Sequence, residues 1–216
     1  MILAAVGMRR EARLVERHGA GRVRAVCGGG RPELLEARLK AALEGAEALI
    51  SIGLGGALDH GLQVGEVVVG SEVLRPRRRW ETDPAWRARL VERLKGARLG
   101  PVYGSDEMVV NALDKAKLRG KGGALLVDME SHVAARVAAG RGLPFAVVRV
   151  VSDTAAVSLP AAVLQGIRDD GTMNLAGVLG ALLRDPRQLP ALLRTGRDAD
   201  LAFKALTRVA NLVFRP

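Results

Sequence analysis

Aromatic side chains are scarce in this sequence. Phe, Trp and Tyr make up 3% of the 216 residues, whereas hydrophobic residues as a group make up 49%. The core must therefore be built mainly from Ala, Val and Leu, and a chain of this length is able to bury one. Proteins that bind single-stranded nucleic acid usually stack the bases on aromatic rings, so the scarcity argues against that class of partner.

Cysteine and histidine are also rare. Cys27 is the single cysteine, which excludes an internal disulfide and a cysteine-based metal cluster. The three histidines, His18, His60 and His132, are not spaced like metal ligands, so the sequence predicts no metal site.

Long apolar runs are missing as well. No run approaches the roughly 18 residues that a membrane-spanning helix needs. The first residues, MILAAVGMRREARL, have no basic segment before their short apolar run, so they predict a first strand and not a signal peptide. We expect a cytoplasmic protein.

The chain is strongly basic. Lys and Arg number 33 against 23 Asp and Glu, which gives a formal net charge of +10. Such an excess favours nucleic acid, anionic lipid or phosphate as a partner. It can equally reflect an arginine-rich composition with no partner behind it. Because stacking residues are few, we expect no nucleic acid.

Strands and helices alternate in the first part of the chain, with strands expected near 2–7, 22–27, 48–53, 124–128 and 145–151. This alternation predicts an α/β core over residues 1–160, with helices on both faces of a sheet. The basic stretch 74–84 is expected to be an exposed loop. From residue 161 no strand remains, and 161–216 is predicted to be a helical extension packed on the core. In it, Asp185-Pro186 should start a helix, Gly196 should interrupt one, and Asp198 should cap the last.

Two apolar runs meet acidic residues. LLVDMESHVA contains Asp128 and Glu130, and FAVVRVVSDTA closes with Asp153. A buried carboxylate is costly unless something pairs with it, and ligands of open α/β sheets bind at the carboxyl ends of strands. We expect Asp128 to serve the start of the next helix, where an acid is favourable to the helix dipole. Glu130 and Asp153 are expected to be functional.

Three ordered motifs carry a resemblance to a known family. They are VGMRREARL, ISIGLGGALDHGLQVGEVVVGSEV and VDMESHVAARVAAGRGLPFAVVRVVSDTA. Together they resemble the nucleoside phosphorylase superfamily, especially the methylthioadenosine/S-adenosylhomocysteine nucleosidases, over roughly residues 1–155. The resemblance implies an enzyme with a three-layer α/β sandwich around a central mixed sheet. The tail QGIRDDGTMNLAGVLGALLRDPRQLPALLRTGRDADLAFKAL resembles the C-terminal extension of hopanoid-associated phosphorylases, which are thought to remove adenine from adenosylhopane, a lipid nucleoside.

The resemblance also assigns the acids. Asp153 would protonate the purine N7 as the base leaves, and burial suits this role because it disfavours the charged form of a carboxyl. Glu130 would accept hydrogen bonds from the ribose hydroxyls, and Met129 would pack on the sugar. The base-binding residues would be Met108, Val109 and Ser152. Met108 stands where these nucleosidases have a stacking aromatic residue, which is a departure from their pattern.

The nucleophile is less clearly marked. The glycine-rich loop has no hydroxyl, but its backbone amides could hold an anion with help from nearby arginines. The residues assigned to phosphate or water are Gly53, Gly55, Gly56, Arg9 and Arg10. Glu11 matches the water-handling glutamate of the nucleosidases and is the second predicted catalytic residue, although it could be a surface acid of the first helix. Glu11 favours water and the tail favours phosphate. We slightly favour phosphate as a co-substrate and expect no cofactor.

The resemblance suggests partners as well. Related nucleosidases close the 5′ pocket with a second subunit, which predicts a homodimer. The tail helices are predicted to build an apolar 5′ pocket and to rest on the membrane surface; otherwise they cover the core or a dimer seam. The basic residues beside their apolar stripes are Arg184, Arg187, Arg194, Arg197, Lys204 and Arg208. Two rival functions stay open: a nucleosidase for soluble methylthioadenosine or S-adenosylhomocysteine, and a non-enzymatic module that binds nucleotides or nucleic acid.

Overall fold

The computed structural model describes residues 1–166, 168 and 170–215. Its strands and helices are, in chain order, β1 Ile2–Val6, α1 Arg9–Gly19, β2 Val23–Cys27, α2 Pro32–Ala41, β3 Ala48–Ala57, β4 Val67–Arg75, β5 Arg78–Glu81, α3 Pro84–Arg93, β6 Arg98–Gly104, α4 Ala112–Gly120, β7 Leu126–Asp128, α5 Ser131–Ala139, β8 Phe145–Asp153, η1 Ala161–Gln165, α6 Leu175–Arg184, η2 Pro186–Gln188 and α7 Leu189–Phe214. The η elements are short 3₁₀ helices.

The eight strands of the described chain form one mixed sheet. β1 pairs in parallel with β2 and β3. From β3 the sheet closes on itself, because β8 joins β3 to β4 on one side while β7 and β6 join them on the other. The register shifts between Gly55 and Gly56 in β3 and between Gly70 and Val73 in β4, which lets these strands bend into the closed part. The expected central mixed sheet is confirmed.

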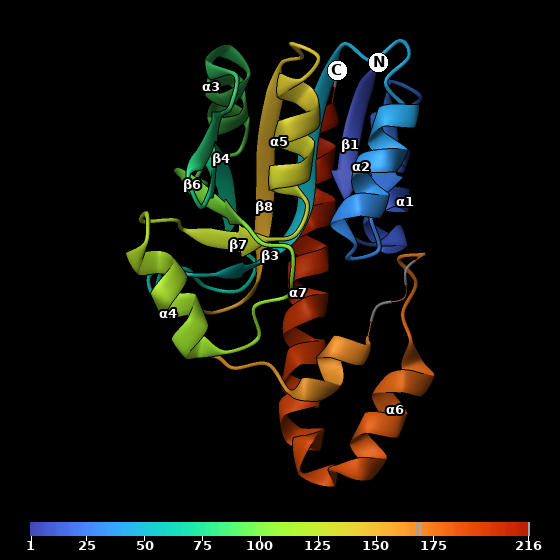
Figure 1. Cartoon of the computed structure of the whole chain (residues 1–216), viewed down its shortest axis with the longest axis vertical. Helices are drawn as coiled ribbons and strands as arrows, with labels where there is room; N and C mark the ends of the chain where they lie inside the picture. Colours follow the sequence, from blue (N-terminus) through green and yellow to red (C-terminus); the bar gives the residue numbers. More distant parts are fainter. Residues whose placement is uncertain (167, 169, 216) are drawn as a thin grey trace.

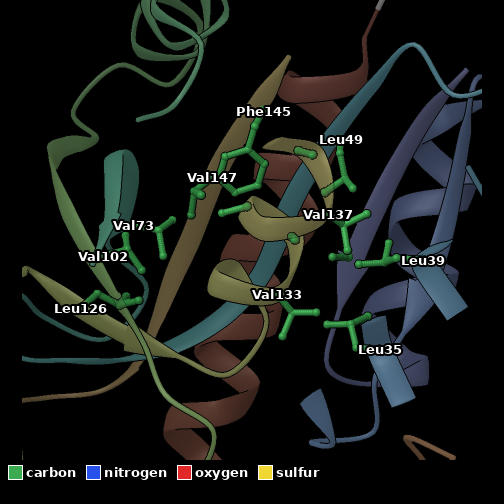
Figure 2. Close-up of a cluster of buried hydrophobic side chains, with 14 of the residues drawn as sticks. Leu35, Leu39, Leu49, Val73, Val102, Leu126, Val133, Val137, Phe145 and Val147 are labelled. Carbon is green, nitrogen blue, oxygen red and sulfur yellow. The ribbon is translucent and has the colours of Figure 1, made fainter. Parts of the chain in front are cut away.

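Helices cover both faces of the sheet (Figure 1). On one face α2 and α5 bury Leu35, Leu39, Val133 and Val137 against strand residues such as Val147, as Figure 2 shows. Along β8 the side chains alternate between the two faces, as they must in a strand. Val148 therefore joins the opposite core, which α1, α3 and α7 cover.

Three local expectations were wrong. The basic stretch after β4 is not a loop, since β5 pairs with β4 and places Trp80 opposite Val73, partly buried against the core. The glycine-rich segment is not a loop either, because β3 runs on to Ala57. α7 continues without a break through Gly196 and Asp198. One helical Gly costs only about 1 kcal/mol, which the buried C-terminal half of α7 offsets.

The C-terminal segment has two parts. The first, which we call the tail arm, consists of η1, α6, η2 and residues 189–201 of α7, and it projects below the α/β body (Figure 1). The second part is the rest of α7, whose Ala202, Phe203, Leu206 and Val209 are buried in the core. Within the described ranges, none of the helices combines the length and the apolar character that crossing a bilayer requires. The boundary drawn at residue 160 stays a prediction.

Candidate active site

The predicted site residues converge on the carboxyl ends of β3 and β8. These two strands run side by side in parallel, and Gly56 lies opposite Asp153. β1 ends next to them and leads into α1, which carries Glu11. Glu130 directly precedes α5, after β7 has ended. The arrangement is typical of ligand sites in α/β sheets.

A buried arginine connects the acids of this region. Arg149, in the middle of β8, pairs through Nε with Asp128 Oδ2 at 2.7 Å and through Nη1 with Glu130 Oε2 at 3.1 Å. Its Nη2 donates to Ser51 Oγ at 2.5 Å. The Arg149 side chain is 0% exposed, so its charge must be balanced by these carboxylates. Sequence reasoning missed Arg149, although a charged residue inside the apolar run FAVVRVV was a visible signal.

Glu11 is held by three backbone amides. Its Oε2 accepts from the N–H groups of Gly7 at 2.8 Å and Met8 at 2.9 Å, and its Oε1 accepts from Leu54 N at 2.8 Å. The residue is 2% exposed. Burial raises the pKa of Glu11, while Arg149 and the amides act against that rise. The structure thus places Glu11 inside the site region and not on the surface of α1.

Glu130 and Asp128 have different environments. Burial raises the pKa of Glu130 to about 7; Arg149 opposes this shift, and the charges of Asp128 and Glu11 add to it. Asp128 accepts from the amides of Glu130 at 3.1 Å and Ser131 at 2.8 Å through Oδ1. The expected role of Asp128 at the start of α5 is confirmed, with the ion pair to Arg149 as an addition.

Asp153 has a partner that the sequence did not reveal. Lys115 of α4 forms an ion pair with Asp153 Oδ2, and its side chain is 0% exposed. The same Nζ donates to the carbonyls of Thr154 at 3.0 Å and Val157 at 2.9 Å. Ser152 Oγ lies 2.7 Å from Asp153 Oδ1. Leu118, three residues after Lys115, lies on the same side of α4 and packs on the core. This spacing was the one signal in the sequence that Lys115 faces inward.

Glycines let the carboxylates approach the backbone. A Cβ atom at Gly7 would lie 2.7 Å from Glu130 Oε1, and one at Gly53 would lie 2.6 Å from Glu11 Oε1. At Gly56 it would lie 3.1 Å from Asp153 Oδ2, a smaller overlap. Gly55 instead packs against β7, since its Cβ would lie 2.5 Å from Leu126 Cδ2. In this structure the glycines make room for acids, and their role toward phosphate or water stays a prediction.

The two arginines assigned to the nucleophile contact the C-terminal segment. Arg9 Nε donates to the Asp170 carbonyl at 2.9 Å, and its Nη2 pairs with the carboxylate at 3.5 Å. Arg10 lies over the Phe203 ring at 3.9 Å and pairs with Asp200 at 3.5 Å. These contacts hold both side chains against the C-terminal segment. They do not test the predicted part of the two arginines in anion binding.

The predicted base and sugar contacts lie around this region. Met108 and Val109 are half-buried in the loop before α4, and Val109 packs on the cluster of Leu58 and Tyr103. Met129 and Ser152 are half-buried beside Glu130 and Asp153. These assignments stay predictions. Of two hollows on the described surface, of about 400 and 540 Å³, the first is lined by Arg9 but by none of the acids of the site, and the second by none of the predicted site residues, so shape alone does not mark the site.

The charges are distributed unevenly along the site. Asp153 and Lys115 form a balanced pair at one end. At the other end Glu11, Asp128 and Glu130 surround the single charge of Arg149. Such a site can stabilise positive charge beside the second group of acids while a proton is delivered from the first pair.

A family model identifies the superfamily of this chain. The Phosphorylase superfamily model matches residues 7–184. The chain belongs to the phosphorylase superfamily. It is therefore an enzyme of the nucleoside phosphorylase and nucleosidase superfamily, whose general reaction is cleavage of a nucleoside N-glycosidic bond. A search of curated proteins gives no match.

Solved structures of this superfamily share the fold. The 5′-methylthioadenosine/S-adenosylhomocysteine nucleosidase from Neisseria meningitidis, in complex with methylthio-immucillin-A, superposes with a TM-score of 0.72 at 16% identity, covering 100% of this chain and 99% of that one. The S-adenosylhomocysteine nucleosidase from Streptococcus pyogenes gives 0.62 at 20% identity, covering 97% and 95%. A futalosine hydrolase mutant from Helicobacter pylori gives 0.64 at 16% identity, covering 85% and 98%. The predicted nucleoside phosphorylase-like fold is confirmed.

Proposed function

We propose that this phosphorylase-superfamily enzyme releases adenine from a nucleoside that carries a large apolar 5′ group. The observation that supports this most is the pair of buried acids, Asp153 and Glu130, which lie at the ends of two strands that both pair with β3, each beside a buried cation. Asp153 passes a proton to N7 of the departing base. Glu130 binds the ribose hydroxyls, and its charge favours a sugar that becomes cationic in the transition state.

The contacts of Glu11 support water as the nucleophile over phosphate. Its carboxylate already occupies the amides of Gly7, Met8 and Leu54, which an incoming anion would need. A buried carboxylate also repels phosphate. Because burial raises the pKa of Glu11, this group is suited to take a proton from water. Phosphorolysis is the second candidate, and the resemblance of the tail to hopanoid-associated phosphorylases is what favours it.

The tail arm supports a lipid-linked substrate, and adenosylhopane is the one that the resemblance of the tail suggests. α6 has no buried residue. Its Leu175, Leu179 and Leu183 follow one another at four-residue spacing and are 69%, 58% and 76% exposed. Side chains at this spacing share one face of a helix.

The same arm supports a contact with an anionic membrane surface. Leu189 and Leu193 extend the exposed apolar residues onto α7, and exposed basic residues lie beside them at positions 184, 187, 194 and 197. An apolar face with a basic border is typical of helices that lie in a lipid interface. The same residues could instead form a homodimer interface, in which a second subunit covers this face and completes the 5′ pocket.

The activity can be tested by measuring free adenine. Purified protein is incubated with adenosylhopane in detergent micelles, with methylthioadenosine and with S-adenosylhomocysteine, each with and without phosphate. We expect adenine from adenosylhopane without phosphate. A strict need for phosphate would make the enzyme a phosphorylase, and release from the soluble nucleosides alone would support the rival nucleosidase. If no adenine appears from any of them, the proposed function is wrong.

Asp153→Asn tests the acid. The amide oxygen still accepts from Lys115, so the variant should fold with a near-native melting temperature. Its turnover should fall by about 10²–10⁴-fold, the usual contribution of a general acid. Near-native turnover would remove Asp153 from the mechanism.

Flotation with anionic vesicles tests the membrane contact. Wild type should bind in a salt-sensitive way, and the triple variant Leu175→Gln, Leu179→Gln, Leu183→Gln should lose binding. Leu113→Gln is the matched control, since Leu113 is 70% exposed on α4, outside the tail arm. If the vesicles are not bound and the triple change instead dissociates a dimer in sedimentation, the face is a subunit interface.

A further inference from the structure

Among the residues that the structure describes, Lys115 is one of two fully buried cations near the proposed reaction, the other being Arg149. It sits on α4 with a side-chain exposure of 0%, and its neighbours along the helix, Asp114 and Lys117, are exposed. Taking an ammonium out of water is costly unless all its protons find acceptors. Lys115 has three such acceptors, the Asp153 carboxylate and the carbonyls of Thr154 and Val157.

The ion pair creates a problem for Asp153 as an acid. A lysine ammonium in hydrogen-bond contact stabilises the ionised form of a carboxyl group. In the resting enzyme the proton of this pair is therefore on Lys115, and Asp153 has none of its own to give. The leaving purine still requires one, and Lys115 is the titratable group in direct contact with Asp153.

We propose that Lys115 supplies the proton that Asp153 passes to the leaving base, an inference that rests on the proposed function. As the C1′–N9 bond breaks, its electron pair moves onto the purine. The Asp153 carboxylate takes a proton from Nζ and passes a proton to N7, so the base leaves neutral. Lys115 becomes a neutral amine and Asp153 remains a carboxylate. The proton that water loses when it adds to C1′ later restores the ammonium, so the whole reaction consumes none.

The three acceptors suit both protonation states. As an ammonium, Lys115 donates one N–H to each of them. After the first transfer, the neutral amine keeps two N–H groups for the carbonyls of Thr154 and Val157, and its lone pair accepts the new O–H of Asp153. Until the proton passes on to N7, no buried polar group loses its partner, which avoids a cost of about 1–3 kcal/mol for each orphaned group. Lys115 is thus a positioning residue that acts through Asp153.

Two substitutions separate proton supply from charge and from packing. Lys115→Arg keeps a positive charge that does not give up its proton, and Lys115→Met keeps most of the volume without charge. Lys117→Met is the matched control, because Lys117 lies two residues further on the same helix and is 71% exposed. Each variant is assayed between pH 5 and 9 on the adenine nucleoside that wild type cleaves best, and on 4-nitrophenyl β-D-riboside, whose leaving group departs without protonation.

Both Lys115 variants should lose about 10²–10⁴-fold in adenine release at pH 8, while cleavage of the nitrophenyl riboside stays within a few-fold of wild type. Lys117→Met should match wild type on both compounds.

Three results would overturn the inference. Full adenine release by Lys115→Arg would mean that only the charge matters. An equal loss on both compounds would mean that Lys115 is structural. Full adenine release by Lys115→Met would remove any role. A wild type that cleaves no adenine nucleoside overturns the proposed function itself, and the inference with it.

Discussion

Replacing Arg149 by Met should destabilise the protein in a pH-dependent way. The change removes the guanidinium that pairs with Asp128 at 2.7 Å and Glu130 at 3.1 Å, and it leaves Glu11 without its nearby cation. Removing one partner of a buried ion pair typically costs about 3–5 kcal/mol. For a chain of this size each kcal/mol lowers the melting temperature by about 2–4 °C, so we expect a loss of roughly 6–20 °C at pH 8.

The loss should be smaller at pH 5. Burial raises the pKa of Glu11 and raises that of Glu130 to about 7, so both groups favour the protonated form in the folded state. The contribution of the two raised pKa values to the free energy of unfolding is complete below the pKa of the unfolded state, about 4.5. It is lost as the pH rises through the pKa of each group in the folded state. Without Arg149 both pKa values rise further, so lowering the pH from 8 to 5 favours the neutral forms of Glu11 and Glu130, and the missing cation then costs less stability.

Thermal unfolding followed by circular dichroism at pH 5 and pH 8 measures both effects. Arg141→Met is the control, since Arg141 is exposed in the loop between α5 and β8. An equal loss of stability at the two pH values would refute the coupling between Arg149 and the acids. A loss below about 1 kcal/mol at pH 8 would refute the claim that Arg149 balances their charge.

Two further changes probe the same cluster. Gly53→Ala puts a methyl group 2.6 Å from Glu11 Oε1. It should displace that carboxylate and lower adenine release at least about tenfold, a misplacement effect. Gly120→Ala, at the end of α4 with no atom within 4 Å of its Cβ, should leave activity unchanged. Glu130→Gln removes a carboxyl whose pKa burial raises from 4.5 to about 7. The unfolding free energy of the variant relative to wild type should therefore increase between pH 5 and pH 8, by at most about 3 kcal/mol. A constant difference in unfolding free energy across that range would contradict the shifted pKa.

The sequence predicted the fold well because the evidence for it is local and periodic. Apolar strands alternating with helices gave the layers, and the acids after the apolar runs pointed to the strand ends where Glu130 and Asp153 lie. Lys115 and Arg149 escaped because their roles come from partners that are distant in the chain, 38 residues away for Lys115 and Asp153. The break expected at Gly196 failed for a related reason: burial of Phe203 and Leu206 further along keeps α7 continuous.

The position of α7 determines when the protein can finish folding during its synthesis. Its last turns cover one face of the sheet, where Phe203, Leu206 and Phe214 complete the core beneath α1 and β8. Arg22, just before β2, donates to the carbonyl of Phe214 at 2.7 Å and so fixes the end of α7. α7 follows all eight strands of the described chain in the sequence, so the part of this face that it covers stays open to solvent until α7 is synthesised. Removing the last three turns of α7 would therefore also expose the β1 residues Ala4 and Val6, which belong to the same hydrophobic cluster.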